Sequence, residues 1–210
     1  MPKTQGYDRF SEKYDQWYDD HPSLYQSELA LLQHLLPSGE GIEIGAGTAR
    51  FAAPLHIATA IEPSAAMRAL AAKRGIQALD GVAEALPVAE ASHDFALFVT
   101  AICFVDSVEK ALSEAFRVVK PNGWVLVAFI DKHSELGQQY QQLKADNPFY
   151  AQAQFVSVDD ITTQLKHAGF AAPECYQTLC PQDMDQTDTL PFKPGFGDGA
   201  FVVAKAQKPA

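Results

Sequence analysis

The chain has 210 residues, 47% hydrophobic and 20% charged, which is typical of one folded globular domain rather than a disordered chain. Its formal net charge of −10 argues against a nucleic-acid partner, because phosphate binding requires clustered Lys and Arg. The polar start and the lack of an apolar run of membrane-spanning length lead us to expect a cytoplasmic protein with no membrane partner.

Two amphipathic helices are expected at the start of the chain. Aromatic residues recur at helical spacing over 11–20, and a second amphipathic run over 24–36 ends at a Pro-Ser-Gly turn. We expect these helices to form an N-terminal cap over residues 1–38. Residues 39–210 would then form the main α/β domain.

From residue 41 onwards, apolar runs alternate with helical segments. The expected strands are 41–45, 57–62, 76–79, 94–99, 124–130, 170–180 and 200–204. The expected helices are 48–54, 64–74, 108–118 and 158–167. This alternation predicts a parallel sheet with right-handed crossovers. A polar insertion at 134–155 is expected to form a helix and loop that cover the sheet edge, and a long loop is expected at 181–199.

The run GIEIGAGTAR, residues 41–50, is a buried strand that enters a glycine turn. The next apolar strand ends on Glu62. A strand, glycine turn and helix followed by a strand ending in an acid are typical of a nucleotide or nucleoside pocket. The glycines let the backbone approach the ligand, and the carboxylate can accept both ribose hydroxyls. Arg50 stands where a dinucleotide-binding fingerprint has its third glycine.

The glycine turn has the form E-x-G-x-G, starting at Glu43, and resembles motif I of class I S-adenosylmethionine-dependent methyltransferases. Four further segments resemble this family and follow in the family's order: 62–67, 80–87, 92–100 and 117–123. The tyrosine-rich start and the final strand resemble the type 11 branch. The resemblance implies a Rossmann-like, doubly wound, mostly parallel sheet of seven strands. Its last strand would be antiparallel, with helices on both faces and an N-terminal helical lid.

The resemblance also implies S-adenosyl-L-methionine as the cofactor and S-adenosyl-L-homocysteine as the product. Gly45, Ala46 and Gly47 would line the methionine portion of the cofactor. Glu43 would orient the turn or reach the amino group through water, and Glu62 would hold the ribose. The other implied cofactor contacts are Pro63, Met67, Ala83, Glu84, Leu86, Thr100 and Tyr14.

Three positions leave alternatives open. Val82 stands where members of the family often carry an acid that accepts from the adenine amino group. That contact would shift to Ala83 or Glu84, or the amino group would face water. Tyr14 either lids the cofactor or packs in an apolar stripe. Arg50 either pairs with the cofactor carboxylate or is a solvated helix arginine.

The methyl acceptor is expected beyond the carboxyl ends of the fourth and fifth strands, where open α/β sheets bind ligands. Thr100, Cys103 and Phe104 follow the fourth strand, and Asp131 and His133 follow the fifth. His133 is the candidate general base, with a plain surface histidine as the alternative. The cofactor carries its own electrophile, so no universal catalytic residue is expected. The cysteines and histidines have no metal-ligand spacing, and we expect no metal.

The predicted function is methyl transfer from S-adenosylmethionine to a small molecule, at an N, O, S or C atom. The predicted protein is a monomer or homodimer. One alternative is an NAD-dependent oxidoreductase, which Arg50 disfavours because it replaces the third glycine. The other alternative is a protein that binds the cofactor without transferring a methyl group.

Overall fold

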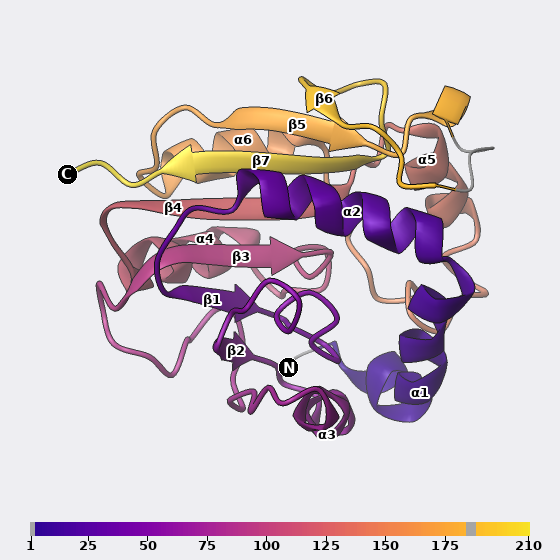
Figure 1. Cartoon of the computed structure of the whole chain (residues 1–210), viewed down its shortest axis with the longest axis horizontal. Coiled ribbons are helices and arrows are strands. Elements are labelled where there is room, and N and C mark those ends of the chain that lie inside the picture. The colour runs from indigo at the N-terminus through magenta and orange to yellow at the C-terminus, as the bar shows by residue number, and fades with distance from the viewer. Residues whose placement is uncertain (1–2, 184–187) are drawn as a thin grey trace.

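The computed structural model describes residues 3–183 and 188–210, which form a seven-stranded sheet with helices on both faces (Figure 1). The strand order is β2-β1-β3-β4-β7-β5-β6. The strands are β1 (Gly41–Ile44), β2 (Thr59–Ile61), β3 (His93–Val99), β4 (Val119–Ile130), β5 (Glu174–Thr178), β6 (Lys193–Pro194) and β7 (Phe201–Gln207). The helices are α1 (Gln5–Asp20), α2 (Pro22–Leu35), α3 (Ala65–Lys73), α4 (Val108–Val118), α5 (Glu135–Gln142) and α6 (Val158–His167), with a short 3₁₀ helix at Pro181–Asp183.

The directions of the strands confirm the predicted doubly wound sheet. Strands β1 to β4 are parallel, and the last strand, β7, runs antiparallel between β4 and β5. Strand β1 pairs with β2 on one side and with β3 on the other, so the chain changes its direction of travel across the sheet there. Open α/β sheets bind ligands at such a switch point, beyond the carboxyl ends of the strands. The turn after β1 therefore occupies the expected ligand position.

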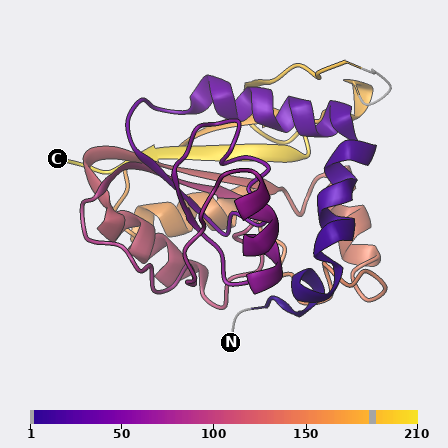
Figure 2. The ribbon, with the colours of Figure 1, turned by 60° about the horizontal axis from the view of Figure 1, so that its bottom comes forward.

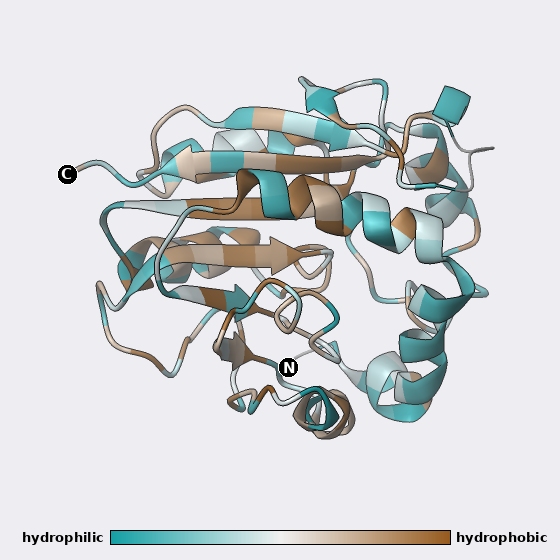
Figure 3. Cartoon of the chain, viewed as in Figure 1, coloured by the Kyte–Doolittle hydropathy of each residue, from teal (hydrophilic) through white to brown (hydrophobic). Residues whose placement is uncertain are grey.

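Two hydrophobic cores lie on opposite faces of the sheet. Side chains alternate along β3, so Ala96 and Phe98 pack with α4 and α6, whereas Phe95 and Leu97 pack with α2. In Figure 3 the central strands are brown along most of their length, whereas α1 is largely teal. Burial of apolar side chains therefore explains the sheet and its flanking helices better than it explains the placement of α1.

Serine side chains fix the starts of four helices. Ser64, Ser107, Ser134 and Ser157 each accept a hydrogen bond from the backbone N–H three residues later, at the starts of α3, α4, α5 and α6. In α6 Asp160 completes a capping box by accepting from the backbone N–H of Ser157. Each cap satisfies a helical N–H that has no partner within the helix, which is worth about 1 kcal/mol. The helix starts predicted at 64, 108 and 158 are confirmed to within one residue.

Three element predictions are wrong. Residues 48–54 form turns instead of a helix, because Ala49 has a φ of 60° and Pro54 has no N–H to donate. Residues 76–79 make a single bridge between Leu79 and Ile61, and Leu79 is 44% exposed, so the segment is not a strand. The loop predicted at 181–199 contains a strand, β6, which has only two residues and carries no apolar pattern.

Helix α1 lies beyond the carboxyl ends of the parallel strands and is tied there by Asp15 (Figures 1 and 2). The Asp15 carboxylate accepts from Thr48 Oγ1 at 2.6 Å, Arg50 Nε at 3.0 Å and Arg74 Nη2 at 2.7 Å. Burial favours a higher pKa for Asp15, but these hydrogen bonds outweigh burial and lower the pKa to about 2. Arg50 also pairs with Asp19 at 2.8 Å and its side chain is 14% exposed, so Arg50 is not a solvated helix arginine. Its pairing with the cofactor carboxylate stays a prediction.

The 134–155 segment closes the same end of the molecule instead of covering a sheet edge. Its Phe149 ring lies 5.6 Å from the ring of Tyr7 and 5.8 Å from that of Tyr14, measured between centroids. The backbone N–H of Gln154 donates to the carbonyl of Cys103 at 2.7 Å, just beyond β3. The segment and α1 together cover the carboxyl ends of the central strands.

We expect Asp15→Asn to lower the free energy of unfolding by about 1 to 2 kcal/mol, because a neutral amide binds two guanidinium groups less well. The contribution of Asp15 is complete above its unfolded pKa of 3.8 and is lost as the pH falls through about 2. Urea unfolding at a series of pH values would measure both effects.

Asp19→Asn is the matched control, because Asp19 contacts Arg50 alone among the described residues and its side chain is 54% exposed. Its cost should be less than half that of Asp15→Asn. Equal costs for the two variants would contradict the assigned role of Asp15.

Candidate functional site

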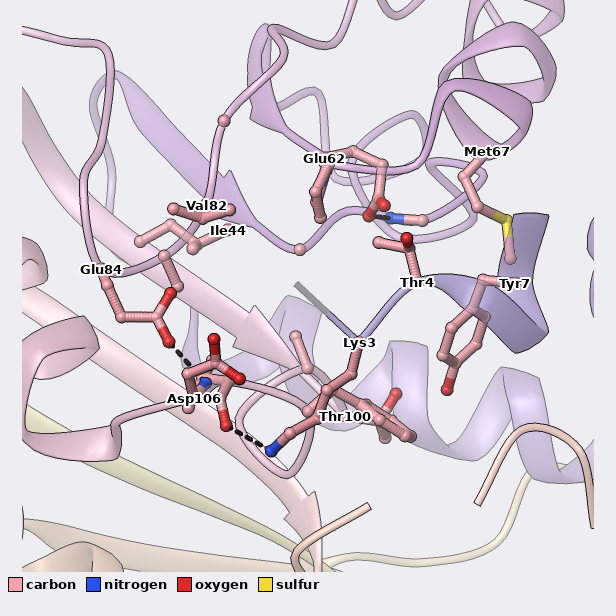
Figure 4. A pocket seen from close by; sticks show the side chains of 18 of the residues that line it. Lys3, Thr4, Tyr7, Ile44, Glu62, Met67, Val82, Glu84, Thr100 and Asp106 are labelled. Atoms are coloured by element: carbon pink, nitrogen blue, oxygen red, sulfur yellow. Dashed lines mark hydrogen bonds between the residues drawn. The ribbon is translucent and has the colours of Figure 1, made fainter. Parts of the chain in front are cut away.

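A cavity of about 550 Å³ lies at the carboxyl ends of β1, β2 and β3 (Figure 4). Its volume is typical of small-ligand pockets. Its walls come from the glycine turn, the end of β2, the start of α3, the 81–84 loop and the start of α1. Nine predicted cofactor contacts line this cavity: Gly45, Gly47, Glu62, Pro63, Met67, Ala83, Glu84, Thr100 and Tyr14.

Two glycines shape the turn after β1. Gly45 and Gly47 have φ values of 73° and 56°, in the left-handed region that favours glycine. A Cβ on Gly45 would lie 2.6 Å from Cβ of Ala101, so a side chain there would clash. A Cβ on Gly47 would lie 3.7 Å from the ring of Tyr14, which is ordinary van der Waals contact. The turn thus exposes backbone at a place where a ligand can approach closely.

The Glu62 carboxylate holds this turn against the end of β2. Its Oε2 accepts from the N–H of Gly47 at 2.8 Å, and its Oε1 accepts from the N–H of Ser64 at 2.8 Å. Burial raises the pKa of Glu62, and the two N–H donors oppose that shift. Each carboxylate oxygen retains a lone pair for a further donor. The pair of oxygens beside the cavity suits the two adjacent hydroxyls of a ribose.

Three predicted cofactor contacts lie outside the lining of the cavity: Glu43, Ala46 and Leu86. Glu43 is 1% exposed and lies behind the turn, where burial raises its pKa to about 8 and the backbone N–H of Ala52 opposes the shift. Its Oε2 has no hydrogen-bond partner among the described residues. The contact with Ala52 suits the predicted role of Glu43 in orienting the turn.

The 81–84 loop forms the wall where the resemblance places adenine. Val82 lines the cavity, as do Ala83 and Glu84. Oε1 of Glu84 already accepts from the backbone N–H groups of Asp106 at 2.6 Å and Ser107 at 3.1 Å. Glu84 therefore supports the entry to α4. This engagement favours backbone atoms or water over Glu84 as the partner of the adenine amino group.

The N-terminal segment contributes three lining residues that the sequence reasoning missed: Lys3, Thr4 and Tyr7. Nζ of Lys3 donates to the carbonyl of Val105 at 2.9 Å, which brings the chain start to the far side of the cavity. The predicted helix began six residues too late, because α1 is kinked at Phe10, where φ is −128°. Tyr7 belongs to the tyrosine-rich start and could have been found from that pattern, whereas Lys3 and Thr4 carry no signal.

A second cavity, of about 500 Å³, adjoins the first. The two share four lining residues: Tyr7, Tyr14, Thr100 and Phe104. Most of the other walls of the second cavity come from α1, α2 and the segment 136–156. Thr100 has a φ of 50°, an uncommon conformation for this residue type at the point where the cavities meet.

Only some of the predicted acceptor-site and catalytic residues line a cavity. Thr100, Cys103 and Phe104 line the second cavity, but Asp131 and His133 line neither. Burial raises the pKa of the Cys103 thiol to about 12, so the reactive thiolate is disfavoured. His133 is exposed, and its backbone N–H donates to Asp131 Oδ1 in a turn.

Two further findings bear on ligand classes. Within residues 3–183 and 188–210, no three His, Cys, Asp or Glu side chains are grouped to hold a metal ion. None of the described helices combines the length and apolar character needed to cross a membrane.

The first cavity fits S-adenosylmethionine. The glycine turn can admit the amino-acid portion, Glu62 can accept from the ribose hydroxyls, and Pro63, Met67 and Val82 give apolar surface for the base.

Comparison with known proteins agrees with this fit. A family model for a methyltransferase domain matches residues 42–127. The chain is 42% identical to a Thermotoga maritima protein of known structure, described as an S-adenosylmethionine-dependent methyltransferase and possible histamine N-methyltransferase. That match covers 98% of this chain and 99% of the other, with a TM-score of 0.94.

Two other proteins extend the comparison. An uncharacterized protein of Methanocaldococcus jannaschii is 36% identical over 202 residues, which are 96% of this chain and 98% of that protein. The geranyl diphosphate C-methyltransferase of Streptomyces coelicolor, solved with S-adenosyl-L-homocysteine, shares the fold at 14% identity and a TM-score of 0.67. That match covers 88% of this chain and 79% of the other.

Glu62→Gln is expected to weaken S-adenosylhomocysteine binding by about tenfold to a hundredfold, because one of its two acceptor oxygens becomes a donor facing a backbone N–H. Isothermal titration calorimetry would measure the loss. Glu90→Gln, which removes an exposed carboxylate in the loop before β3, is the control and should bind like the wild type. Unchanged affinity in Glu62→Gln would show that this carboxylate does not hold the ribose.

Proposed function

Because the chain belongs to the class I S-adenosylmethionine-dependent methyltransferases, type 11 branch, we propose that it transfers a methyl group to a small-molecule acceptor. The observation that carries this proposal is the second cavity, which meets the cofactor cavity at Tyr7, Tyr14, Thr100 and Phe104. Its volume of about 500 Å³ and its walls from several separate segments suit a small molecule better than a polypeptide.

The chain's own residues would act mainly by position. When bound, S-adenosylmethionine supplies an activated methyl group on a sulfonium centre. Gly45, Gly47 and Glu62 would fix one reactant, and the walls of the second cavity would hold the other against Thr100 and Phe104. Fixing two reactants in line and excluding water can supply much of the barrier reduction. Because the cofactor supplies the electrophile and the protein positions the reactants, the proposed reaction requires no dedicated catalytic side chain.

Labelled methyl transfer from S-adenosylmethionine to a panel of amines, imidazoles, phenols, carboxylic acids and thiols would test the proposal. The description of the Thermotoga maritima protein as a possible histamine N-methyltransferase makes amine and imidazole nitrogens the first acceptors to try. We expect label in one class of acceptor. Binding of S-adenosylhomocysteine without transfer to any class would favour the cofactor-binding alternative, and tight NAD binding without it would favour an oxidoreductase.

His133→Ala should leave the rate of methyl transfer within about twofold of the wild type, because His133 is exposed and lines neither cavity. A positioned general base contributes about a hundredfold or more, so the two roles are easily separated. Initial rates of methyl transfer with saturating cofactor would distinguish the two roles. A loss of rate of about a hundredfold in His133→Ala would support His133 as the general base.

A further inference from the structure

Glu28 is a buried acid for which the fold provides no partner. It lies in the middle of α2, is 5% exposed, and lines the second cavity. Within the described part of the chain, no hydrogen bond or ion pair engages its carboxyl group, and burial alone accounts for the raised pKa of this acid. Two other acids at this end of the molecule accept hydrogen bonds from the protein: Asp15 from three residues and Glu62 from two backbone N–H groups.

An unpaired buried carboxylate is costly, because its charge loses hydration and gains nothing in return. Burial is the cause that raises the pKa of Glu28 to about 8. An apolar residue in this position on α2 would pack without that cost. An unpaired acid on a cavity wall points to a ligand that binds there and offsets the desolvation of the carboxylate.

The surroundings of Glu28 indicate the charge of that ligand. The phenol groups of Tyr14, Tyr18 and Tyr140 lie close enough for the Glu28 carboxylate to oppose their ionisation. Further aromatic side chains from Trp17, Phe129, Phe149 and Tyr150 line the same cavity. The remaining charged lining residues, Lys13 and Asp146, are exposed at its edge.

Aromatic faces and a carboxylate both attract cations, through the ring quadrupole and through charge-assisted hydrogen bonds. An anionic acceptor would keep Glu28 in its neutral, protonated form, and a neutral acceptor would not favour the carboxylate, whereas a cation gains from the negative charge. We propose that Glu28 binds a positively charged nitrogen of the methyl acceptor, so that the substrate is a small protonated amine with an apolar or aromatic body. This assignment rests on the proposed function for the identity of the ligand as methyl acceptor.

Binding of such a cation should release a proton from Glu28. The free protein keeps Glu28 largely protonated at pH 7, since its pKa is about 8. A bound cation favours the carboxylate, so binding near pH 7 releases up to about one proton, and affinity rises with pH towards 8. The other titratable groups that face Glu28 do not mask this release. The phenols of Tyr14, Tyr18 and Tyr140 and the thiol of Cys103 have raised pKa values and stay protonated.

The experiment uses full-length protein saturated with S-adenosylhomocysteine. The probes are 2-phenylethylamine, tyramine, tryptamine and histamine, each paired with the alcohol that replaces its primary amine, together with 3-phenylpropanoate as the anion. Calorimetry in two buffers of different ionisation enthalpy gives both the affinity and the number of protons released. We expect at least one amine to bind, with proton release, and its alcohol to bind more weakly.

Glu28→Gln should lower the affinity for that amine by about thirtyfold or more and abolish the proton release. The variant should bind the alcohol as tightly as the wild type does. It should melt at the wild-type temperature or above, because it removes a buried acid with no partner. Glu12→Gln, on the exposed side of α1, is the matched control and should change neither quantity.

Unchanged amine affinity in Glu28→Gln would overturn the assignment, as would tighter binding of the alcohols or the anion, or no binding by any amine at millimolar concentration. Methyl transfer assayed on the same samples separates the two proposals. Binding that depends on Glu28 without transfer would reject the proposed function alone. Transfer that is indifferent to Glu28 would reject this inference alone.

Discussion

The carboxylates of α1, above all that of Asp15, tie this helix to the end of the sheet, and both cavities depend on that placement. Asp15 joins α1 to Thr48, Arg50 and Arg74, which belong to the glycine turn and the end of α3. Two aromatic residues on α1, Tyr7 and Tyr14, then form walls common to both cavities. Although α1 is largely polar, its aromatic side chains pack against the core, so charge pairing and aromatic packing together hold this wall in place.

Three buried acids near this wall differ in what the protein gives them. Glu62 receives two N–H bonds and faces the cofactor cavity, so its burial is compensated before any ligand arrives. Glu43 receives the backbone N–H of Ala52 and keeps one oxygen unpartnered behind the turn. Glu28 receives nothing and faces the second cavity. The cofactor site is thus preorganised by the chain, whereas the second cavity is left for a ligand to complete.

The sequence predicted the parts of the site that are local in the chain. The glycine turn and Glu62 lie within one strand-turn-strand unit, and their spacing alone indicates the pocket. The ion pairs of Arg50 join residues more than 30 positions apart, and no local pattern reveals them. The second cavity is assembled from α1, α2, the end of β3 and the 134–155 segment, so Glu28 is an ordinary helix acid until the fold buries it. The predicted helix at 48–54 failed because the turn imposes a left-handed residue at Ala49.

We propose that two adjoining cavities hold the cofactor and a cationic acceptor. A crystal structure with S-adenosylhomocysteine and the tightest-binding amine tests it most directly. We predict the ribose hydroxyls at about 2.8 Å from Glu62, and the ammonium nitrogen at about 3 Å from Glu28. A ribose away from Glu62, or an amine bound with Glu28 still unpaired, would contradict it.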